Sequence, residues 1–312
     1  MTRWGLVATI KAPVADTLAF AAWHLEQGAS RIFIYLDDAN PQAAEYLAAH
    51  PTCRVTLTDD AWWAKRGRRP EKHQVRQSRN ATNAYRRAGD VDWLAHIDVD
   101  EFLIAEGDIA ACLAALPQAV TCARVRPMEA LAGEGTAFKA FIPQGPDRPR
   151  LVQEIYPTFG RDVRGGFLSH LAGKLFLRTG LPDLKLRIHN AFLGDEMNPG
   201  EVELPGIDLA HLHAKDWAHF LSAYRYRLER GSYRADLAPS RPRDKGGISL
   251  HDLFHRIEAE SGEEGLRAFF DEVAADTPRL RAALSERGLL RRVDLPLDAL
   301  RRKHFPDFTP DC

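Results

Sequence analysis

The chain has 312 residues, of which 45% are hydrophobic and 27% are charged, the ordinary balance of a globular protein. Its 42 Lys and Arg residues nearly match its 43 Asp and Glu residues, and the net charge of -1 excludes a general electrostatic attraction to nucleic acid or to an anionic membrane. No apolar run approaches the roughly 20 residues of a spanning helix, and four scattered cysteines predict reduced thiols in a cytoplasmic protein.

Strand-like and helix-like patterns alternate through the first part of the chain. We expect strands at 4–10, 31–36, 54–58, 93–97 and 120–126, and helices at 14–27, 42–50, 71–88 and 110–116. This order predicts an α/β fold with a mostly parallel sheet that is covered by helices on both faces.

The second half of the sequence is less regular. Residues 127–205 are rich in Gly and Pro and predict loops and short strands over a site. The pattern becomes helical from Trp217, and Thr277-Pro278 has the residue types of a helix start. We therefore expect one catalytic domain at 1–245 and a small C-terminal helical extension at 246–312.

Three acids follow the apolar strand predicted at 93–97. They are Asp98, Asp100 and Glu101. Ligands bind open α/β sheets at the carboxyl ends of the strands, and two converging carboxylates suit Mg²⁺ or Mn²⁺, which could hold a diphosphate. The alternative is the acidic first turn of a helix, which the helix dipole would favour.

Four segments in this order resemble glycosyltransferases of the GT-A fold, close to the family 2 type. Trp23-His24 with Gly28 resembles the "W-H-x-x-x-G" of that family, and Arg79-Asn80 resembles its "A-R-N" element. Asp98-Val99-Asp100-Glu101 resembles the "D-x-D-[DE]" metal motif, and His211 to Trp217 resembles the late "H-Y-x-x-K-S" segment. The resemblance implies a Rossmann-like sheet and a nucleotide-sugar donor.

The resemblance also implies roles for single residues. The expected metal ligands are Asp98, Asp100 and His213, and the expected nucleotide contacts are Thr9, Asp37, Gln77, Arg79, Asn80, Asp98 and Lys174. Two alternatives remain open at this point. His213 can be a structural residue whose hydrogen bonds are satisfied within the protein, and Lys174 can be an exposed strand residue.

An inverting transfer needs a general base on the acceptor side of the site. Asp195 and Glu196 are the first candidates, in a segment rich in turn formers, and Glu129 is a runner-up. A plain solvated turn is the alternative for the first two.

The resulting hypothesis is a metal-dependent hexosyltransferase of polysaccharide biosynthesis. It would use a UDP- or GDP-sugar and a glycan, lipid-linked or small-molecule hydroxyl, with Mn²⁺ or Mg²⁺ and with peripheral membrane contact at most. Many relatives carry Lys-Asn-Glu after the first strand, whereas Lys11 is followed here by Ala12-Pro13. That departure favours the alternative of a catalytically silent nucleotide- or glycan-binding module. A third hypothesis is a two-metal nuclease or phosphatase.

Overall fold

A computed structural model describes residues 1–230 and 248–309 of the chain. The chain divides into two compact units. Unit 1 comprises Met1–Arg126, Ala172–Leu209 and Pro296–Cys312, and unit 2 comprises Pro127–Leu171 and Ala210–Leu295. The border expected between 245 and 246 lies outside the described residues, and both units are assembled from segments that are distant in sequence.

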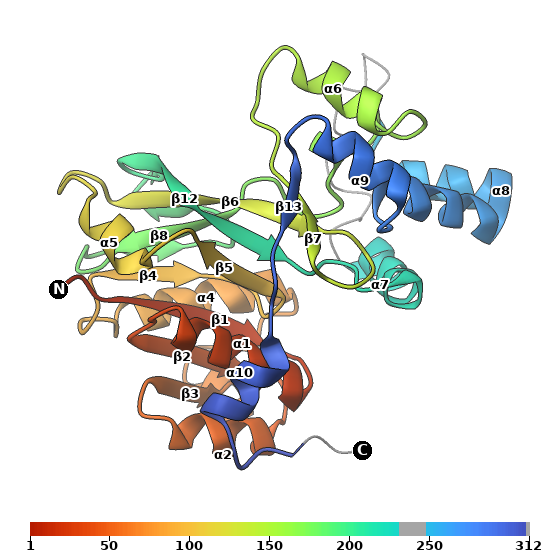
Figure 1. Cartoon of the computed structure of the whole chain (residues 1–312). Helices are drawn as coiled ribbons and strands as arrows, with labels where there is room; N and C mark the ends of the chain where they lie inside the picture. The colour runs from red at the N-terminus through yellow and green to blue at the C-terminus, as the bar shows by residue number, and fades with distance from the viewer. Residues whose placement is uncertain (231–247, 310–312) are drawn as a thin grey trace. The chain divides into compact units, whose positions relative to one another are not determined.

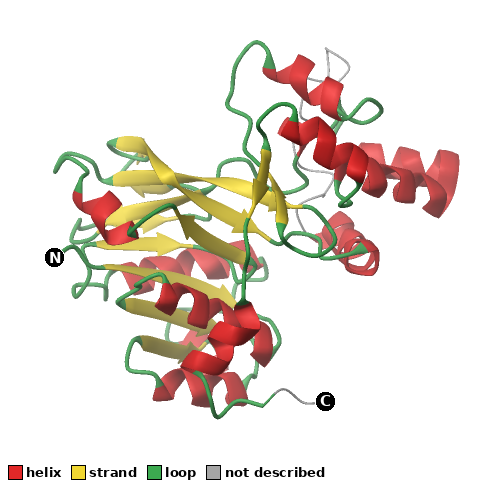
Figure 2. Ribbon diagram, in the orientation of Figure 1, coloured by secondary structure: helices red, strands yellow, loops and turns green. Residues whose placement is uncertain are grey.

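Unit 1 contains the α/β part of the chain (Figures 1 and 2). Its elements are β1 (Trp4–Ile10), α1 (Val14–Glu26), β2 (Arg31–Leu36), α2 (Pro41–Ala49), β3 (Cys53–Leu57), α3 (Asp60–Ala64), α4 (His73–Tyr85), β4 (Trp93–His96), β5 (Glu101–Ala105), α5 (Ile109–Ala114), β8 (Lys174–Arg178), β9 (Leu184–Leu186), β10 (Ala191–Leu193), β11 (Glu196–Met197) and α10 (Leu297–His304). Two long strands, β6 (Cys122–Ala130) and β12 (Glu201–His211), begin in unit 1.

The sheet of unit 1 is mixed. Strands β3, β2, β1 and β4 are neighbours in that order and run parallel, and β8 then pairs antiparallel with both β4 and β6. In this register Thr9 lies opposite Tyr35, and Val7 lies opposite His96. The carboxyl ends of β1, β2 and β4 therefore meet at one edge of the sheet, and the predicted α/β class is confirmed.

Different helices cover the two faces of this sheet, because side chains alternate between the faces along each strand. Val7 and Phe33 pack in one core cluster with Ala81 and Ala84 of α4, so α4 covers that face. Successive strand residues point to opposite faces, which places Leu6 on the other side. There α10 lies against α1, and Lys303 forms an ion pair with Glu26 at 2.7 Å (Figure 1).

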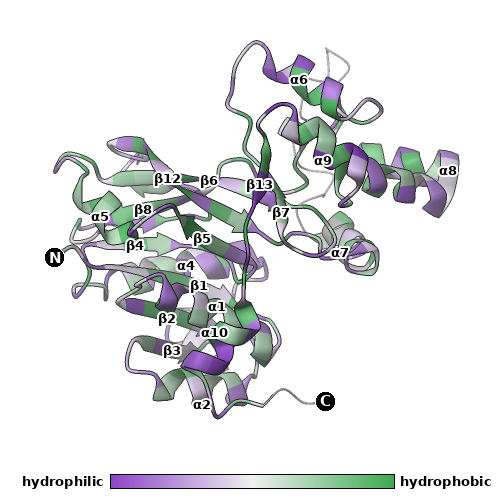
Figure 3. Ribbon diagram, in the orientation of Figure 1, coloured by the Kyte–Doolittle hydropathy of each residue, from purple (hydrophilic) through white to green (hydrophobic). Residues whose placement is uncertain are grey.

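Unit 2 is mainly helical. Its elements are the end of β6, β7 (Ala137–Lys139), α6 (Arg148–Ile155), η1 (Arg164–Gly166), the end of β12, α7 (Trp217–Arg230), α8 (Leu250–Val273), α9 (Pro278–Ser285) and β13 (Leu290–Arg292). Hydrophobic and hydrophilic segments alternate along α8 (Figure 3), which buries Phe254 and Phe269 in a core with Phe220. The predicted start of α9 is confirmed, because the Thr277 hydroxyl accepts the Leu280 N–H at 3.2 Å.

The sequence pattern missed one strand: the acids after β4 do not open a helix, because Glu101 begins strand β5. The irregular segment 127–205 contains short strands as expected, of which β9, β10 and β11 form a small antiparallel sheet. No helix among residues 1–230 and 248–309 is long and apolar enough to span a membrane.

Candidate functional site

The acids after β4 lie in a tight turn that leads into β5. The Glu101 N–H donates to the Asp98 carbonyl oxygen at 3.1 Å, and the Glu101 carboxylate accepts the Asp98 N–H at 2.8 Å. Ile97 is completely buried, whereas Asp98 and Asp100 are partly exposed. The segment is not extended, but the charge of Asp100 still acts on Asp98. The turn therefore presents two neighbouring carboxylates at the carboxyl end of β4.

Lys174 is buried directly beside these acids. Since β8 runs antiparallel to β4, its first residue lies near the end of β4. Lys174 is 1% exposed, and its Nζ lies 2.7 Å from Asp98 Oδ2 and 3.3 Å from Glu101 Oε2. Burial lowers the pKa of Lys174, but the two carboxylates outweigh burial and raise this pKa above its usual value. The ammonium is therefore charged and held by the acids.

The charge of Lys174 also lowers the pKa values of Asp98 and His96. Burial raises the pKa of Asp98, and the Lys174 ammonium outweighs that effect, so the pKa lies below its usual value. Burial, followed by the Lys174 charge, lowers the pKa of His96 to about 4. His96 Nδ1 donates to the Arg187 carbonyl oxygen at 3.1 Å, and its buried Nε2 has no hydrogen-bond partner among the described residues. His96 is consequently neutral.

Helix α4 contributes an amide to each of two strand ends. Gln77 Nε2 donates to Asp98 Oδ1 at 2.6 Å, and Asn80 Nδ2 donates to Thr9 Oγ1 at 3.2 Å. The two amides are three residues apart and so share one helix face. Both side chains are buried. The structure thus brings together four of the predicted nucleotide contacts where β1 and β4 end.

Arg79 lies on a different face of α4 from its neighbour. Arg79 is exposed, whereas Asn80 is 1% exposed. The structure therefore does not bring Arg79 to the strand ends, because consecutive residues point about 100° apart around a helix. Arg76, one turn earlier, is the arginine of α4 that reaches the edge of the sheet.

Asp37, which follows β2, is enclosed by two arginines. Its carboxylate accepts from Arg76 Nε at 2.8 Å and from Arg69 Nη2 at 3.0 Å, and the Thr58 hydroxyl donates to it at 3.2 Å. Asp37 is 6% exposed. The predicted residue lies at the expected strand end, but its carboxylate positions two guanidinium groups.

The two candidate bases Asp195 and Glu196 lie at the exposed tip of the hairpin that joins β10 and β11. The opposite end of this small sheet is the end that reaches the strand ends, because the Arg187 carbonyl oxygen accepts from His96 and His189 Nδ1 donates to Gly173 at 2.9 Å. The structure therefore does not bring the hairpin tip to the acids.

Glu129 and His213 both belong to unit 2, whereas Asp98 and Asp100 belong to unit 1. Glu129 forms a buried ion pair with Lys139 at 2.7 Å and accepts the Leu168 and Ser169 N–H groups at 3.1 and 2.7 Å. Burial opposes ionisation, but Lys139 and then His213 outweigh it and lower the pKa of Glu129 to about 2. The buried ring of His213 lies 5.0 Å from the ring of His211. Glu129 is therefore held inside unit 2 by Lys139 and by two backbone N–H groups.

The acidic turn fits a divalent cation that arrives with phosphate oxygens. The part of the chain that the structure describes contains no group of three or more His, Cys, Asp or Glu side chains able to hold a metal ion. However, Mg²⁺ commonly uses one or two carboxylates and takes its other ligands from water and substrate phosphates. Asp98, Asp100, Glu101 and Lys174 together carry a net charge of -2, which complements such a cation.

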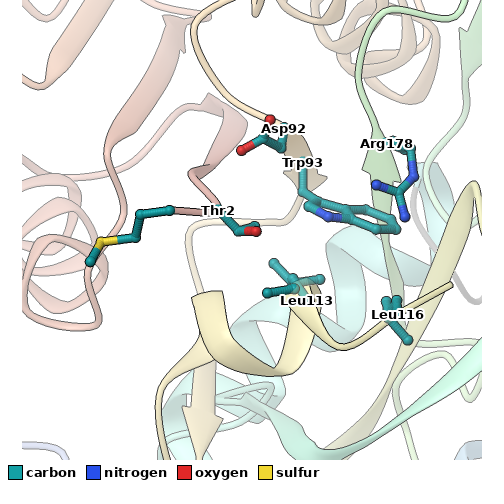
Figure 4. Close-up of a pocket in the computed structure, with 8 residues that line it drawn as sticks. Thr2, Asp92, Trp93, Leu113, Leu116 and Arg178 are labelled. Atoms are coloured by element: carbon teal, nitrogen blue, oxygen red, sulfur yellow. The ribbon is translucent and has the colours of Figure 1, made fainter. Parts of the chain in front are cut away.

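A cavity of about 270 Å³ opens at the other end of β4 (Figure 4). It is lined by Asp92, Trp93 and Arg178 among others. Asp92 accepts the Arg3 N–H at 2.7 Å, and the Arg178 guanidinium lies 4.3 Å from the Trp93 ring centre and donates to the Val120 carbonyl oxygen. These polar groups already have partners, so the cavity gives no separate indication of a ligand.

Comparisons with known proteins place the chain at a distance from characterised examples. No family model and no curated protein matches the sequence. Among solved structures, one match is the crystal structure of GalNAc-T7 with UDP, GalNAc and Mn²⁺, at 12% identity and a TM-score of 0.34. That match covers 98% of this chain and 58% of the GalNAc-T7 chain.

A second match is mannose-1-phosphate geranyltransferase from Thermus thermophilus, at 11% identity and a TM-score of 0.27. It covers 82% of this chain and 68% of the other.

Sequence reasoning missed two residues of this edge, Arg76 and His96. Arg76 holds Asp37 together with Arg69, and His96 has a buried nitrogen, beside Asp98 and Lys174, that no described residue contacts through a hydrogen bond. The position of His96 at the end of an apolar strand, two residues before Asp98, was the available signal. No comparable signal marked Arg76 in its largely polar helix.

Proposed function

We propose that this chain is a metal-dependent glycosyltransferase that moves a sugar from a nucleotide-diphosphate donor to a hydroxyl acceptor. One observation carries the proposal: Gln77 and Asn80 of α4 meet Asp98 and Thr9 at the edge where β1 and β4 end, and Asp100 lies in the same turn. This is the edge at which α/β sheets bind nucleotides. The resemblance of the acidic turn to a family 2-type metal motif supports the same function.

In this proposal, Asp100 is the direct ligand of Mn²⁺ or Mg²⁺, and Asp98 contacts the ribose or a metal-bound water. His213 stays a predicted further ligand. When bound, the cation would supply Lewis-acid stabilisation of the leaving diphosphate. Gln77 fixes the carboxylate of Asp98, and the Thr9–Asn80 pair and Asp37 border the nucleoside. These contacts pre-organise the donor before its anomeric bond breaks.

The transfer replaces one bond at the anomeric carbon with another. The bond to the diphosphate oxygen breaks, the leaving group takes the electron pair, and the acceptor oxygen bonds to the same carbon. In an inverting reaction the proton of the acceptor hydroxyl passes to a general base. A base is most effective when its pKa lies near the ambient pH, so a pKa of about 2 argues against Glu129 in this role. Asp195 and Glu196 stay predictions for this role.

A panel of UDP-, GDP-, CMP- and dTDP-sugars, incubated with and without Mn²⁺, tests the proposal through release of the free nucleotide. We expect nucleotide release from one donor, which we expect to be a UDP- or GDP-sugar. The rate of release should fall by more than about 100-fold in Asp100→Asn, because one charge-stabilising group is removed. Glu106→Gln is the matched control, since Glu106 is an exposed acid directly after β5.

The outcomes separate the competing functions. Mn²⁺-dependent nucleotide binding without release from any donor, even with added acceptor sugars, would indicate a binding module. Cleavage of phosphodiesters without a sugar donor would indicate the nuclease alternative. Equal release by wild type and Asp100→Asn would contradict the proposed role of the acidic turn.

A further inference from the structure

A lysine ammonium lies inside the acidic cluster that the proposed function assigns to a metal. Lysine is almost never fully buried unless it is paired, and Lys174 is 1% exposed with Asp98 at 2.7 Å and Glu101 at 3.3 Å. Burying this charge costs free energy, which the two carboxylates must offset. The ion pairs of Lys174 with Asp98 and Glu101 are therefore a structural part of the site.

The backbone before Lys174 is tightly constrained. Gly173 has a φ of +66°, and a Cβ there would overlap the Val125 carbonyl oxygen. The Gly173 carbonyl oxygen in turn accepts from His189 Nδ1 at 2.9 Å. Lys174 also pairs with Val125 in the sheet. These constraints place the start of the lysine side chain at the end of β4 and limit its displacement.

Lys174 contacts two acids of the turn, Asp98 and Glu101. Both oxygens of Asp98 accept strong donors, one from Gln77 and one from Lys174, and Glu101 accepts from the Asp98 N–H and lies beside the ammonium. A divalent cation bound directly to Asp98 would therefore stand within a few ångströms of another positive charge. Two positive charges at such a distance repel each other, so Lys174 weakens the binding of a cation to Asp98.

We propose that Lys174 is an internal cation that prevents Asp98 and Glu101 from ligating a free divalent ion. The metal then binds to Asp100 when the diphosphate of the donor binds with it, and not before. This inference rests on the proposed function and adds an order of binding to it. Lys174 is then a positioning residue, which differs from the direct diphosphate contact expected from the sequence.

The test is a titration of the full chain with Mn²⁺ alone at pH 8, in which free Mn²⁺ is followed by electron paramagnetic resonance. Wild type should bind Mn²⁺ weakly without nucleotide and much more tightly with UDP or GDP. Lys174→Met should bind Mn²⁺ alone at least about tenfold more tightly, because an adjacent positive charge is removed. The double variant Lys174→Met/Asp98→Asn should bind Mn²⁺ alone more weakly than Lys174→Met does, because one of the two freed carboxylates is neutralised.

Two results would overturn the inference. One is unchanged or weaker Mn²⁺ binding by Lys174→Met in a sample whose circular dichroism spectrum matches wild type, together with weaker nucleotide binding, as expected for a direct diphosphate contact. The other is tight binding of Mn²⁺ alone by wild type, which can be measured even if the variant does not fold. Failure of the proposed function has a different signature, namely that wild type binds no nucleotide with or without Mn²⁺.

Discussion

The residues at the carboxyl edge of the sheet act in small hydrogen-bonded sets. Asp98 is held by Gln77 and Lys174, and Asp37 is held by Arg69 and Arg76. Asp98, Gln77 and Asn80 could be predicted because strand ends bind ligands and because the residues resemble a family motif. The contribution of Arg76 in place of Arg79 could not, since a largely polar helix gives no clear phase from which its inward face can be read.

The Glu129–Lys139 pair makes a residue-scale prediction about stability. Lys139 Nζ also donates to the carbonyl oxygens of Gly166 at 2.8 Å and Val273 at 2.9 Å. Lys139→Met leaves a buried carboxylate without its counter-ion, so we expect the free energy of unfolding to fall by about 3–5 kcal/mol. Urea denaturation measures this change. Arg150→Met, which breaks an exposed pair with Glu154, should leave the denaturation midpoint unaltered, and an equal effect of both variants would contradict the prediction.

At the scale of elements, the first half of the fold was predictable with its bounds, whereas the single strands of the irregular segment 127–205 were not. Strands β1 and β2 have the predicted bounds, and α4 and β4 differ from them by three residues or fewer at each end. Parallel strands buried on both faces have continuous apolar runs that are easily recognised. Strands such as β9 and β11 are only two or three residues long, and their pairing partners are set by tertiary contacts that a local pattern does not contain.

The start of β8 can be tested with a matched pair of glycines. Gly173→Ala adds a Cβ that overlaps the Val125 carbonyl oxygen at a positive φ, so we expect it to lower the free energy of unfolding by more than about 2 kcal/mol. Gly180 follows the same strand with a φ of +84° and open space around its Cβ position. Gly180→Ala should therefore cost only about 1 kcal/mol. Similar costs in urea denaturation would show that the close approach at Gly173 does not matter.

At the scale of the whole molecule, the expected border between 245 and 246 lies outside the described residues and stays a prediction. Each compact unit gathers segments that are distant in sequence. For example, α10 packs on α1 of unit 1, although more than 270 residues separate Glu26 from Lys303. Such groupings depend on long-range packing. The helical character expected for the C-terminal segment is present in α8, α9 and α10.

The pH dependence of stability is a property of the whole molecule to which two buried histidines, His24 and His96, contribute. His24 Nδ1 donates to the Phe20 carbonyl oxygen at 2.8 Å, and Nε2 accepts the Leu103 N–H at 3.4 Å, so the folded state holds a neutral ring. Burial lowers the pKa of His24 to about 3 and that of His96 to about 4. Below an unfolded pKa of about 6.5 the unfolded state binds more protons, and acid therefore favours unfolding.

We expect the free energy of unfolding to decrease as the pH falls from 7 to 5, by up to about 1.4 kcal/mol per pH unit for each histidine. This pH range lies above the usual carboxylate pKa values. The slope measured there therefore reports the histidines and not Asp98 or Glu129. Urea denaturation at several pH values measures the slope, and His24→Gln should reduce it. A slope that is flat in wild type would show that the buried rings do not govern acid stability.

The central claim is that the turn after β4 binds a metal–diphosphate, and its most direct test is calorimetric titration of UDP and GDP into the full chain with and without Mn²⁺. We expect Mn²⁺ to tighten binding of one nucleotide in wild type and in Glu106→Gln, and to have no effect in Asp100→Asn, in which the proposed metal ligand is replaced by a neutral amide. Mn²⁺-dependent binding that persists unchanged in Asp100→Asn, or no nucleotide binding by wild type, would contradict this account.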